Sequence, residues 1–177
     1  MNNKHKISVI TVTKNSAKYL QDNIDSLSNQ TYKNFEHIII DGKSSDRTIE
    51  IIKKNLNKIS YWESNFDNGL YDAMNKGIKN TAGDIIGILN SDDFYYADAL
   101  SIVNHYFTKY PNIDFLFGTV QKYKLMHGFY PKKIKWTFGF YTSHSVGFFI
   151  RKSSQLKLGY YDTQYKFSAD YDLFYRM

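Results

Sequence analysis

Residues 6–13 read Lys-Ile-Ser-Val-Ile-Thr-Val-Thr, a β-branched run flanked by polar residues. Such a run is typical of a buried β-strand. Apolar residues then recur at helical spacing from Ala17 to Leu27. Asn15 or Ser16 can cap the first turn of that helix. The first pair of elements is therefore expected to be a strand followed by a helix.

The same order repeats through the first half of the chain. Strand-like runs occupy residues 35–40, 59–63 and 84–89. The helices between these runs have their apolar faces at Ile49, Ile52 and Leu56 in one, and at Leu70, Ala73, Met74 and Ile78 in the next. Alternating strands and helices predict an α/β fold with a Rossmann-like, mostly parallel sheet.

The pattern changes after Pro111. Short extended pieces at residues 113–120 and 144–150 are separated by polar loops. This predicts a mixed C-terminal part of the sheet beside the parallel half.

Length and composition limit the kind of protein. A chain of 177 residues without an internal repeat or linker is expected to form a single domain over residues 1–177. Hydrophobic residues make up 42% and charged residues 23%, which is typical of a globular rather than a disordered protein. The absence of cysteine excludes a disulfide framework, a cysteine metal site and a cysteine nucleophile.

Hydropathy and charge bear on location and partners. A membrane-spanning helix needs ~20 apolar residues, and no stretch of the sequence approaches that length. We expect a cytoplasmic protein, either free or peripheral at the inner face of the cell membrane. The net charge of +6 includes Lys132, Lys133 and Lys135, which form either a solvated loop or a surface for an anionic partner. The aromatic content of 18% leaves room for a homodimer interface.

Acidic residues follow three of the predicted strands. Asp41 ends the second, Glu63 the third, and Asp92 and Asp93 follow the fourth. Each alone is most simply a turn-former or a helix cap. Ligands bind beyond the carboxyl ends of the strands in open α/β sheets, so three acidic ends at one edge favour a binding site there.

The segment from Asn90 to Asp93 reads Asn-Ser-Asp-Asp and is the most informative of these ends. Adjacent carboxylates repel each other unless a positive charge lies nearby. Mg²⁺ or Mn²⁺ is usually held by one or two carboxylates together with substrate phosphates. Alternatively, Asp92 or Asp93 caps the helix predicted around Leu100, and both interpretations stay open. Since the first strand is followed by no glycine-rich loop, any bound nucleotide must be held by other means, and a metal on the diphosphate would serve.

Taken in order, several blocks of the sequence resemble the inverting family-two glycosyltransferases, which have the GT-A (nucleotide-diphospho-sugar transferase) fold. The blocks are residues 7–15, 41–48 (Asp-Gly-Lys-Ser-Ser-Asp-Arg-Thr), 68–77 (Asn-Gly-Leu-Tyr-Asp-Ala-Met-Asn-Lys-Gly), 90–93, 144–151, 159–162 and 169–173. The last three are similar to blocks of the branch that synthesises bacterial polysaccharides.

The resemblance implies a nucleotide site in the first half of the chain. Thr11 and Asp41 would contact the base, with the Asp41 carboxylate accepting from N3–H of uracil. Asp92 would ligate the Mn²⁺ or Mg²⁺ that bridges the diphosphate, and Asp93 would lie against the ribose or behind the metal ligands. The family has Asp where this sequence has Asn90, which weakens one anionic contact.

The resemblance also implies a catalytic base. Asp170 would take the proton from the acceptor hydroxyl as that oxygen attacks the anomeric carbon. The family usually has Glu before the base, whereas Ala169 stands here, so Asp172 is the fallback, although on a helix it points about 200° away from Asp170. A plain helix cap is the alternative for Asp170.

Four further residues are candidates. Glu63 and Asp67 could line the nucleoside pocket, and a turn before Gly69 is an equal alternative for Asp67. Asn75 could reach the base or satisfy backbone groups. His144 could contact the acceptor or a phosphate, or be structural.

The resemblance implies a metal-dependent inverting glycosyltransferase that moves a sugar from UDP to a saccharide or lipid-linked acceptor in cell-surface polysaccharide synthesis. Residues 1–93 would be the nucleotide-binding half and residues 94–177 the acceptor half, with a C-terminal truncation after the base motif. Two alternatives are a sugar-nucleotide-binding domain without turnover and a nucleotidyltransferase, which normally needs a glycine-rich basic loop. No nucleic-acid motif is present, so no nucleic-acid partner is expected.

Overall fold

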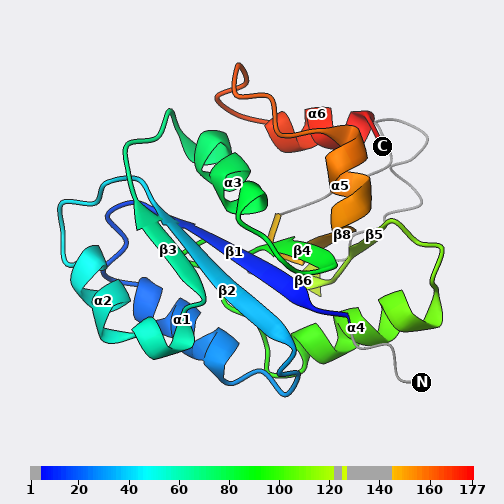
Figure 1. Cartoon of the computed structure of the whole chain (residues 1–177), viewed down its shortest axis with the longest axis horizontal. Helices are drawn as coiled ribbons and strands as arrows, with labels where there is room; N and C mark the ends of the chain where they lie inside the picture. The colour runs from blue at the N-terminus through cyan, green and yellow to red at the C-terminus, as the bar shows by residue number, and fades with distance from the viewer. Residues whose placement is uncertain (1–4, 122–124, 127–144) are drawn as a thin grey trace.

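The computed structural model describes residues 5–121, 125–126 and 145–177. In chain order its elements are β1 (Ile7–Thr13), α1 (Leu20–Ser28), β2 (Phe35–Asp41), α2 (Thr48–Lys54), η1 (Leu56–Lys58), β3 (Tyr61–Ser64), α3 (Leu70–Lys79), β4 (Ile85–Ile88), α4 (Ala99–Lys109), β5 (Phe115–Phe117), β6 (Val120–Gln121), β7 (Leu125–Met126), η2 (Ser145–Gly147), β8 (Phe148–Arg151), α5 (Lys152–Leu158) and α6 (Ala169–Tyr175). Strands and helices alternate from β1 to α4, as the sequence predicts (Figure 1).

The main sheet has the strand order β3-β2-β1-β4-β8-β5. Strands β3, β2, β1 and β4 are parallel, with Thr13 of β1 paired to Asp41 of β2. Strand β8 is antiparallel to both of its neighbours, β4 and β5. The predicted mostly parallel sheet with a mixed C-terminal part is confirmed. The parallel strands present their carboxyl ends at one common edge.

Helices α3, α5 and α6 cover one face of the sheet, and α1, α2 and α4 cover the other (Figure 1). Alternate side chains of a strand point to opposite faces. Ile10 and Val12 of β1 therefore pack in the cluster beneath α3 and α6, whereas Ile7 and Val9 pack with α1 and α4. Each buried isoleucine contributes roughly 1.5–3 kcal/mol, so these two clusters fix the position of the sheet edge.

Helix α3 lies unusually close to β1. A Cβ atom at Gly77 would stand 2.3 Å from Cγ2 of Ile10, so only glycine allows this approach. The contact holds the C-terminal half of α3 against the middle of β1.

Several element boundaries differ from the sequence predictions. Helix α1 begins at Leu20, because Ser16 first closes a turn onto Tyr19, and Asn15 takes a left-handed conformation with φ 52°. Leu56 is 49% exposed rather than buried, because α2 ends at Lys54.

Two cap predictions are also decided. Helix α4 begins at Ala99, so neither Asp92 nor Asp93 caps it, and the capping alternative for this pair is wrong. Helix α6 begins at Ala169 after Ser168, so Asp170 lies inside the first turn rather than at the cap.

Candidate functional site

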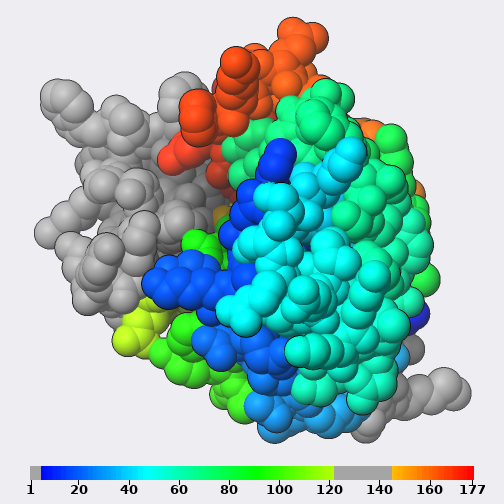
Figure 2. All heavy atoms as spheres, turned by 90° about the vertical axis from the view of Figure 1, so that its left-hand side faces the viewer, coloured from blue at the N-terminus to red at the C-terminus, as the bar shows by residue number. Residues whose placement is uncertain are grey.

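The loops after β1 and β2 meet at the carboxyl edge of the sheet. Figure 2 looks onto this edge, with the blue β1–α1 loop beside the cyan β2–α2 loop. The backbone N–H of Asn15 donates to Oγ of Ser44 at 2.7 Å, and the side-chain oxygen of Asn15 accepts from N–H of Ser45 at 2.8 Å. The left-handed backbone of Asn15 permits this exchange, since asparagine tolerates that conformation. The two loops are therefore joined into one rim.

A cleft of about 450 Å³, here called the central cleft, opens behind this rim. It is lined by the end of β1 and the loop after it, the start of α3 and the segment after β4: Val12, Thr13, Lys14, Ser16, Asp67, Gly69, Leu70, Ala73, Asn90, Ser91 and Asp92. Leu70, predicted to be buried in the helix face, is instead 49% exposed and lies on this wall. The structure thus brings Asp67 and Asp92 to one cleft.

The segment from Asn90 to Asp93 forms a turn at the cleft. The backbone N–H of Asp93 donates to the carbonyl of Asn90 at 3.0 Å, and the hydroxyl of Ser91 donates to that of Ser16 at 2.8 Å. Asp92 is exposed at the turn, whereas Asp93 is half-buried and accepts from the side-chain amide of Asn90 at 3.1 Å.

Two polar oxygens at the central cleft are buried without a hydrogen-bond partner among the described residues. They are Oδ1 of Asn90 and Oγ1 of Thr13. The amide nitrogen of Asn90 is committed to Asp93 and Ser145, which leaves Oδ1 as the acceptor end. Buried polar atoms nearly always have a partner, so these oxygens indicate a ligand.

Asn90 and Asp92 carry the oxygen atoms that a divalent cation prefers as ligands. No group of three acidic or histidine side chains that could hold a metal ion exists among the described residues. The chain could offer the Asp92 carboxylate and the neutral oxygen of Asn90. Mg²⁺ and Mn²⁺ sites of this kind are completed by phosphate oxygens and water.

Asp41 shapes the loop after β2. It is 0% exposed, and its carboxylate accepts from N–H of Ser44 at 2.9 Å and from the hydroxyl of Ser64 at 2.6 Å. The adjacent Gly42 lies against Asp67, since a Cβ atom there would stand 2.3 Å from its Oδ2. The base contact expected of Asp41 stays a prediction.

Asp67 also makes the turn that the sequence offered as an alternative. Its Oδ1 accepts from N–H of Gly69 at 3.0 Å, and Gly69 has a φ of 115° that favours glycine. Asp67 therefore both forms this turn and lines the central cleft.

Thr11 lies within a buried polar group rather than at the strand end. Its hydroxyl donates to Oδ1 of Asn23 at 3.2 Å and lies 2.9 Å from Nε2 of His37. Burial lowers the pKa of His37 to about 3, so its imidazole is neutral. The base contact expected of Thr11 also stays a prediction.

Two other candidates are engaged elsewhere. Glu63 accepts from the hydroxyl of Tyr61 at 2.9 Å on strand β3 and does not line the central cleft. Asn75 is 8% exposed, and its amide donates to the carbonyl of Tyr161 at 2.8 Å and accepts from N–H of the same residue at 2.9 Å. Asn75 thus satisfies backbone groups, the second of its two alternatives. His144 and the Lys132–Lys135 cluster lie outside the described residues.

Asp170 is held by a residue that the sequence gave no reason to choose. The hydroxyl of Tyr71, in the first turn of α3, donates to Oδ1 of Asp170 at 3.2 Å. The N–H of Tyr171 donates to the same oxygen at 3.1 Å. Burial, together with the nearby Asp170 charge, raises the pKa of Tyr71, so its phenol keeps the proton that it donates. Tyr71 follows Leu70 of the cleft wall and thereby links Asp170 to the central cleft.

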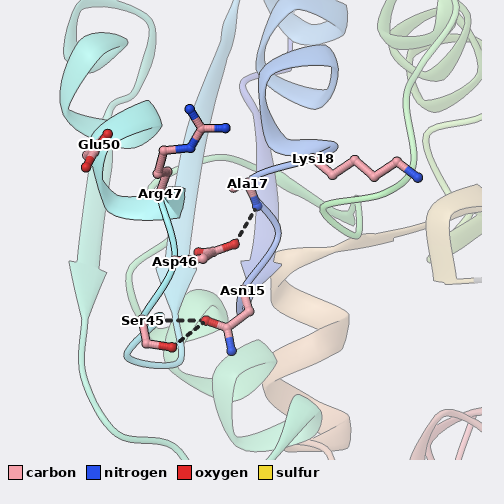
Figure 3. A pocket seen from close by; sticks show the side chains of 7 residues that line it. All are labelled: Asn15, Ala17, Lys18, Ser45, Asp46, Arg47 and Glu50. Atoms are coloured by element: carbon pink, nitrogen blue, oxygen red, sulfur yellow. Dashed lines mark hydrogen bonds between the residues drawn. The ribbon is translucent and has the colours of Figure 1, made fainter.

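A second hollow of about 640 Å³, the outer pocket, lies on the other side of the joined loops (Figure 3). Asp46 there accepts from N–H of Ala17 at 3.0 Å, and the Thr48 hydroxyl bond lowers the pKa of Asp46. The charged side chains of Lys18 and Arg47 extend away from each other. The Asp46 carboxylate of this pocket thus holds the loop after β1 against the start of α2.

Several known glycosyltransferases are similar to this chain in sequence. An uncharacterized glycosyltransferase of Rickettsia typhi is 31% identical over 186 residues, which cover 96% of this chain and 58% of that protein. The PGL/p-HBAD biosynthesis glycosyltransferase of Mycobacterium bovis is 34% identical over 117 residues, covering 64% of this chain and 46% of that protein. An uncharacterized glycosyltransferase of Mycobacterium tuberculosis is 40% identical over 88 residues, or 49% of this chain and 34% of that protein. The chain spans 34–58% of the length of these relatives.

Solved structures share the fold. TarS of S. aureus (residues 1–349) in complex with UDP matches with a TM-score of 0.78 and 21% identity, over 95% of this chain and 53% of that one. The mannosyltransferase PcManGT of Pyrobaculum calidifontis, in complex with GDP-Man and Mn²⁺, matches with a TM-score of 0.70 and 17% identity, over 90% and 48%. These likenesses show that the expected GT-A fold is correct.

The family follows from the sequence itself. Residues 8–172 match the profile described as glycosyl transferase family 2, which is nearly the whole chain. The match runs from β1 to α6 and so includes the central cleft and Asp170. The chain belongs to glycosyl transferase family 2.

Proposed function

We propose that the chain carries a metal-dependent inverting glycosyltransferase activity, which moves a sugar from UDP to a hydroxyl of a saccharide or lipid-linked acceptor. The observation that carries the proposal is the central cleft, where an exposed Asp92 lies on the same turn as the unpaired, buried Oδ1 of Asn90. Family membership supports the reaction class.

A nucleotide-sugar donor is supported by the structural relatives. TarS has been solved with UDP and with UDP-GlcNAc, and PcManGT with GDP-Man and Mn²⁺. Uracil is proposed as the base from the sequence resemblance, in which Asp41 would accept from its N3–H. Asp41, Asp67 and Asp93 are the proposed nucleoside-side residues.

Asp92 and the side-chain oxygen of Asn90 would hold the metal. A Mn²⁺ or Mg²⁺ ion there supplies Lewis-acid stabilisation of the negative charge that develops on the leaving diphosphate. Because Asn90 is neutral, the chain contributes one negative charge fewer than a pair of aspartates would.

Asp170 is the proposed general base. Two donors among the described residues, Tyr71 and the N–H of Tyr171, go to its Oδ1, and we propose that Oδ2 takes the proton. As Oδ2 removes the proton of the acceptor hydroxyl, that oxygen forms a bond to the anomeric carbon and the bond to the diphosphate breaks. Such a single displacement inverts the anomeric centre, and a positioned base contributes about 10²–10⁴ in rate.

The acceptor is proposed from the sequence resemblance and from the name of one relative. The name of the Mycobacterium bovis relative refers to PGL/p-HBAD biosynthesis, and the notion of a saccharide or lipid-linked acceptor in cell-surface polysaccharide synthesis is consistent with it. Among the residues that the structure describes, no helix combines the length and hydropathy needed to cross a membrane. Peripheral membrane association and a homodimer stay predictions.

Calorimetric titration of UDP tests the proposal. We expect binding in Mn²⁺, a much weaker signal in EDTA, and loss of the Mn²⁺-dependent part in Asp92→Ala. Asp114→Ala is the matched control, since that carboxylate bonds to Ser154 away from the cleft. Binding of GDP or another nucleotide in place of UDP would contradict the choice of base, and binding unaffected by EDTA and by Asp92→Ala would contradict the metal.

A further inference from the structure

Helix α1 and the residues just after it carry polar side chains that face the segment after β4. Asn23 contacts the carbonyls of Asn90 and Asp93, Ser26 accepts from N–H of Tyr95, and Gln30 donates to the carbonyl of Tyr96. Asn23 and Ser26 are three residues apart on one face of the helix, and Gln30 follows two residues after the helix ends at Ser28. The helix therefore orders the segment that carries the turn at the central cleft.

Of these residues, Asn23 contacts the turn itself. Its amide nitrogen donates to the carbonyl of Asn90 at 2.9 Å and to the carbonyl of Asp93 at 3.0 Å. These carbonyls stand at the first and last residues of the turn. One buried amide, 1% exposed, thus spans the turn from which Asp92 projects.

The proton arrangement behind Asn23 is fixed by elimination. The hydroxyl proton of Thr11 is donated to Oδ1 of Asn23, so Nε2 of His37 must be the donor to Thr11. In that tautomer the buried Nδ1 atom of His37 is the acceptor nitrogen, and it has no donor among the described residues. His37 therefore donates to Thr11, Thr11 donates to Asn23, and Asn23 donates to the two carbonyls.

We propose that Asn23 is a positioning residue for the metal and diphosphate, held in its orientation by Thr11 and His37. This inference rests on the proposed function, because it concerns the same metal site. Asn23 does not line the central cleft and acts through the Asn90–Asp93 turn. Outer partners of a metal site typically change its affinity by about 10–100-fold when removed.

The test is calorimetric titration of UDP into Asn23→Ala, in Mn²⁺ and in EDTA. We expect affinity to fall by at least about tenfold in Mn²⁺ and to stay unchanged in EDTA. Asn55→Ala is the matched control: Asn55 is also a buried asparagine whose amide makes two donor bonds, to Gln21 and to the carbonyl of Ile51, but it does not reach the turn. Unchanged affinity of Asn23→Ala in Mn²⁺, or an equal fall in Mn²⁺ and EDTA, overturns the role of Asn23.

Thr11→Val gives a second measurement that keeps the shape of the side chain. We expect a smaller loss than in Asn23→Ala, confined to Mn²⁺. A loss of equal size in EDTA would mean that Thr11 contacts the nucleotide instead, and would overturn its supporting role. If the wild-type chain shows no Mn²⁺-dependent UDP binding, the proposed function fails and the Asn23 role fails with it. Wild-type binding that Asn23→Ala leaves intact overturns the Asn23 role alone.

Discussion

His37 places a neutral imidazole in the middle of the sheet, where its Nε2 lies 2.9 Å from the Thr11 hydroxyl. Burial lowers the pKa of His37 from 6.5 to about 3. Between pH 3 and pH 6.5, His37 is therefore protonated in the unfolded chain and neutral in the folded chain. Folding stability contributed in this way is complete above pH 6.5 and is lost as the pH falls towards 3.

We expect the free energy of unfolding to fall by roughly one kcal/mol for each pH unit below 6.5, and His37→Gln to reduce this slope. Glutamine keeps an N–H donor for Thr11 but does not titrate. Denaturant unfolding between pH 5 and 7 measures the slope. His105→Gln, on the exposed side of α4, should behave like wild type; an unchanged slope in His37→Gln would show that His37 does not carry the effect.

The sequence did not show which polar side chains of the candidate site face the cleft and which are hydrogen-bonded within the protein. The sequence selected Asp92 and Asp67, which line the central cleft, and it selected Asn75, whose amide is used by the backbone of Tyr161. It did not select Tyr71, because the contact of a tyrosine with an aspartate 99 residues later depends on tertiary packing.

Helix α1 shows how far sequence periodicity reaches at the scale of an element. Leu20, Ile24 and Leu27 were identified by spacing and are buried. Buried Asn23 of this helix and Gln30, two residues beyond its end, were not identified, because polar residues normally face solvent and nothing in their spacing marks them as buried. Gln30 is 0% exposed and accepts from N–H of Leu100 at 3.0 Å, in the first turn of α4.

Removing the side-chain amide of Gln30 should destabilise the start of α4. Gln30→Ala leaves the N–H of Leu100 and the carbonyl of Tyr96 without partners, and we expect a loss of about 2–3 kcal/mol in the free energy of unfolding. Gln21→Ala on helix α1, which bonds to the side chains of Asp25 and Asn55, should cost less than about 1 kcal/mol. Denaturant midpoints compare the two, and equal losses would refute a special role for Gln30.

At the scale of the whole molecule, the predicted division into residues 1–93 and 94–177 stays a prediction. All the described residues that line the central cleft come from the first half, and Asp170 comes from the second. Helix α3 connects them, since Leu70 lines the cleft and the next residue, Tyr71, bonds to Asp170. Donor binding and proton removal should therefore be separable by substitution.

Asp170→Asn should lower the turnover number by about 10²–10⁴ while leaving UDP affinity in Mn²⁺ unchanged, because only the proton acceptor is lost. Asp172→Asn is the control on the same helix, where the carboxylate pairs with Arg176 at 2.9 Å. Sugar transfer and UDP titration are measured on both variants. Near-normal turnover in Asp170→Asn together with a collapse in Asp172→Asn would move the base to Asp172.

The long stretch of sequence between β4 and its neighbour β8 leaves one edge of β4 unpaired while the chain is being synthesised. Strand β4 pairs with β1 on one side, but its other neighbour, β8, starts at Phe148, 60 residues after β4 ends at Ile88. At ~5–20 residues per second, a ribosome takes several seconds to make that stretch. During this time the Ile-Ile-Gly-Ile edge of β4 has open backbone groups and apolar side chains, the kind of edge that pairs with other chains. The nascent protein therefore exposes an aggregation-prone edge between the emergence of β4 and that of β8.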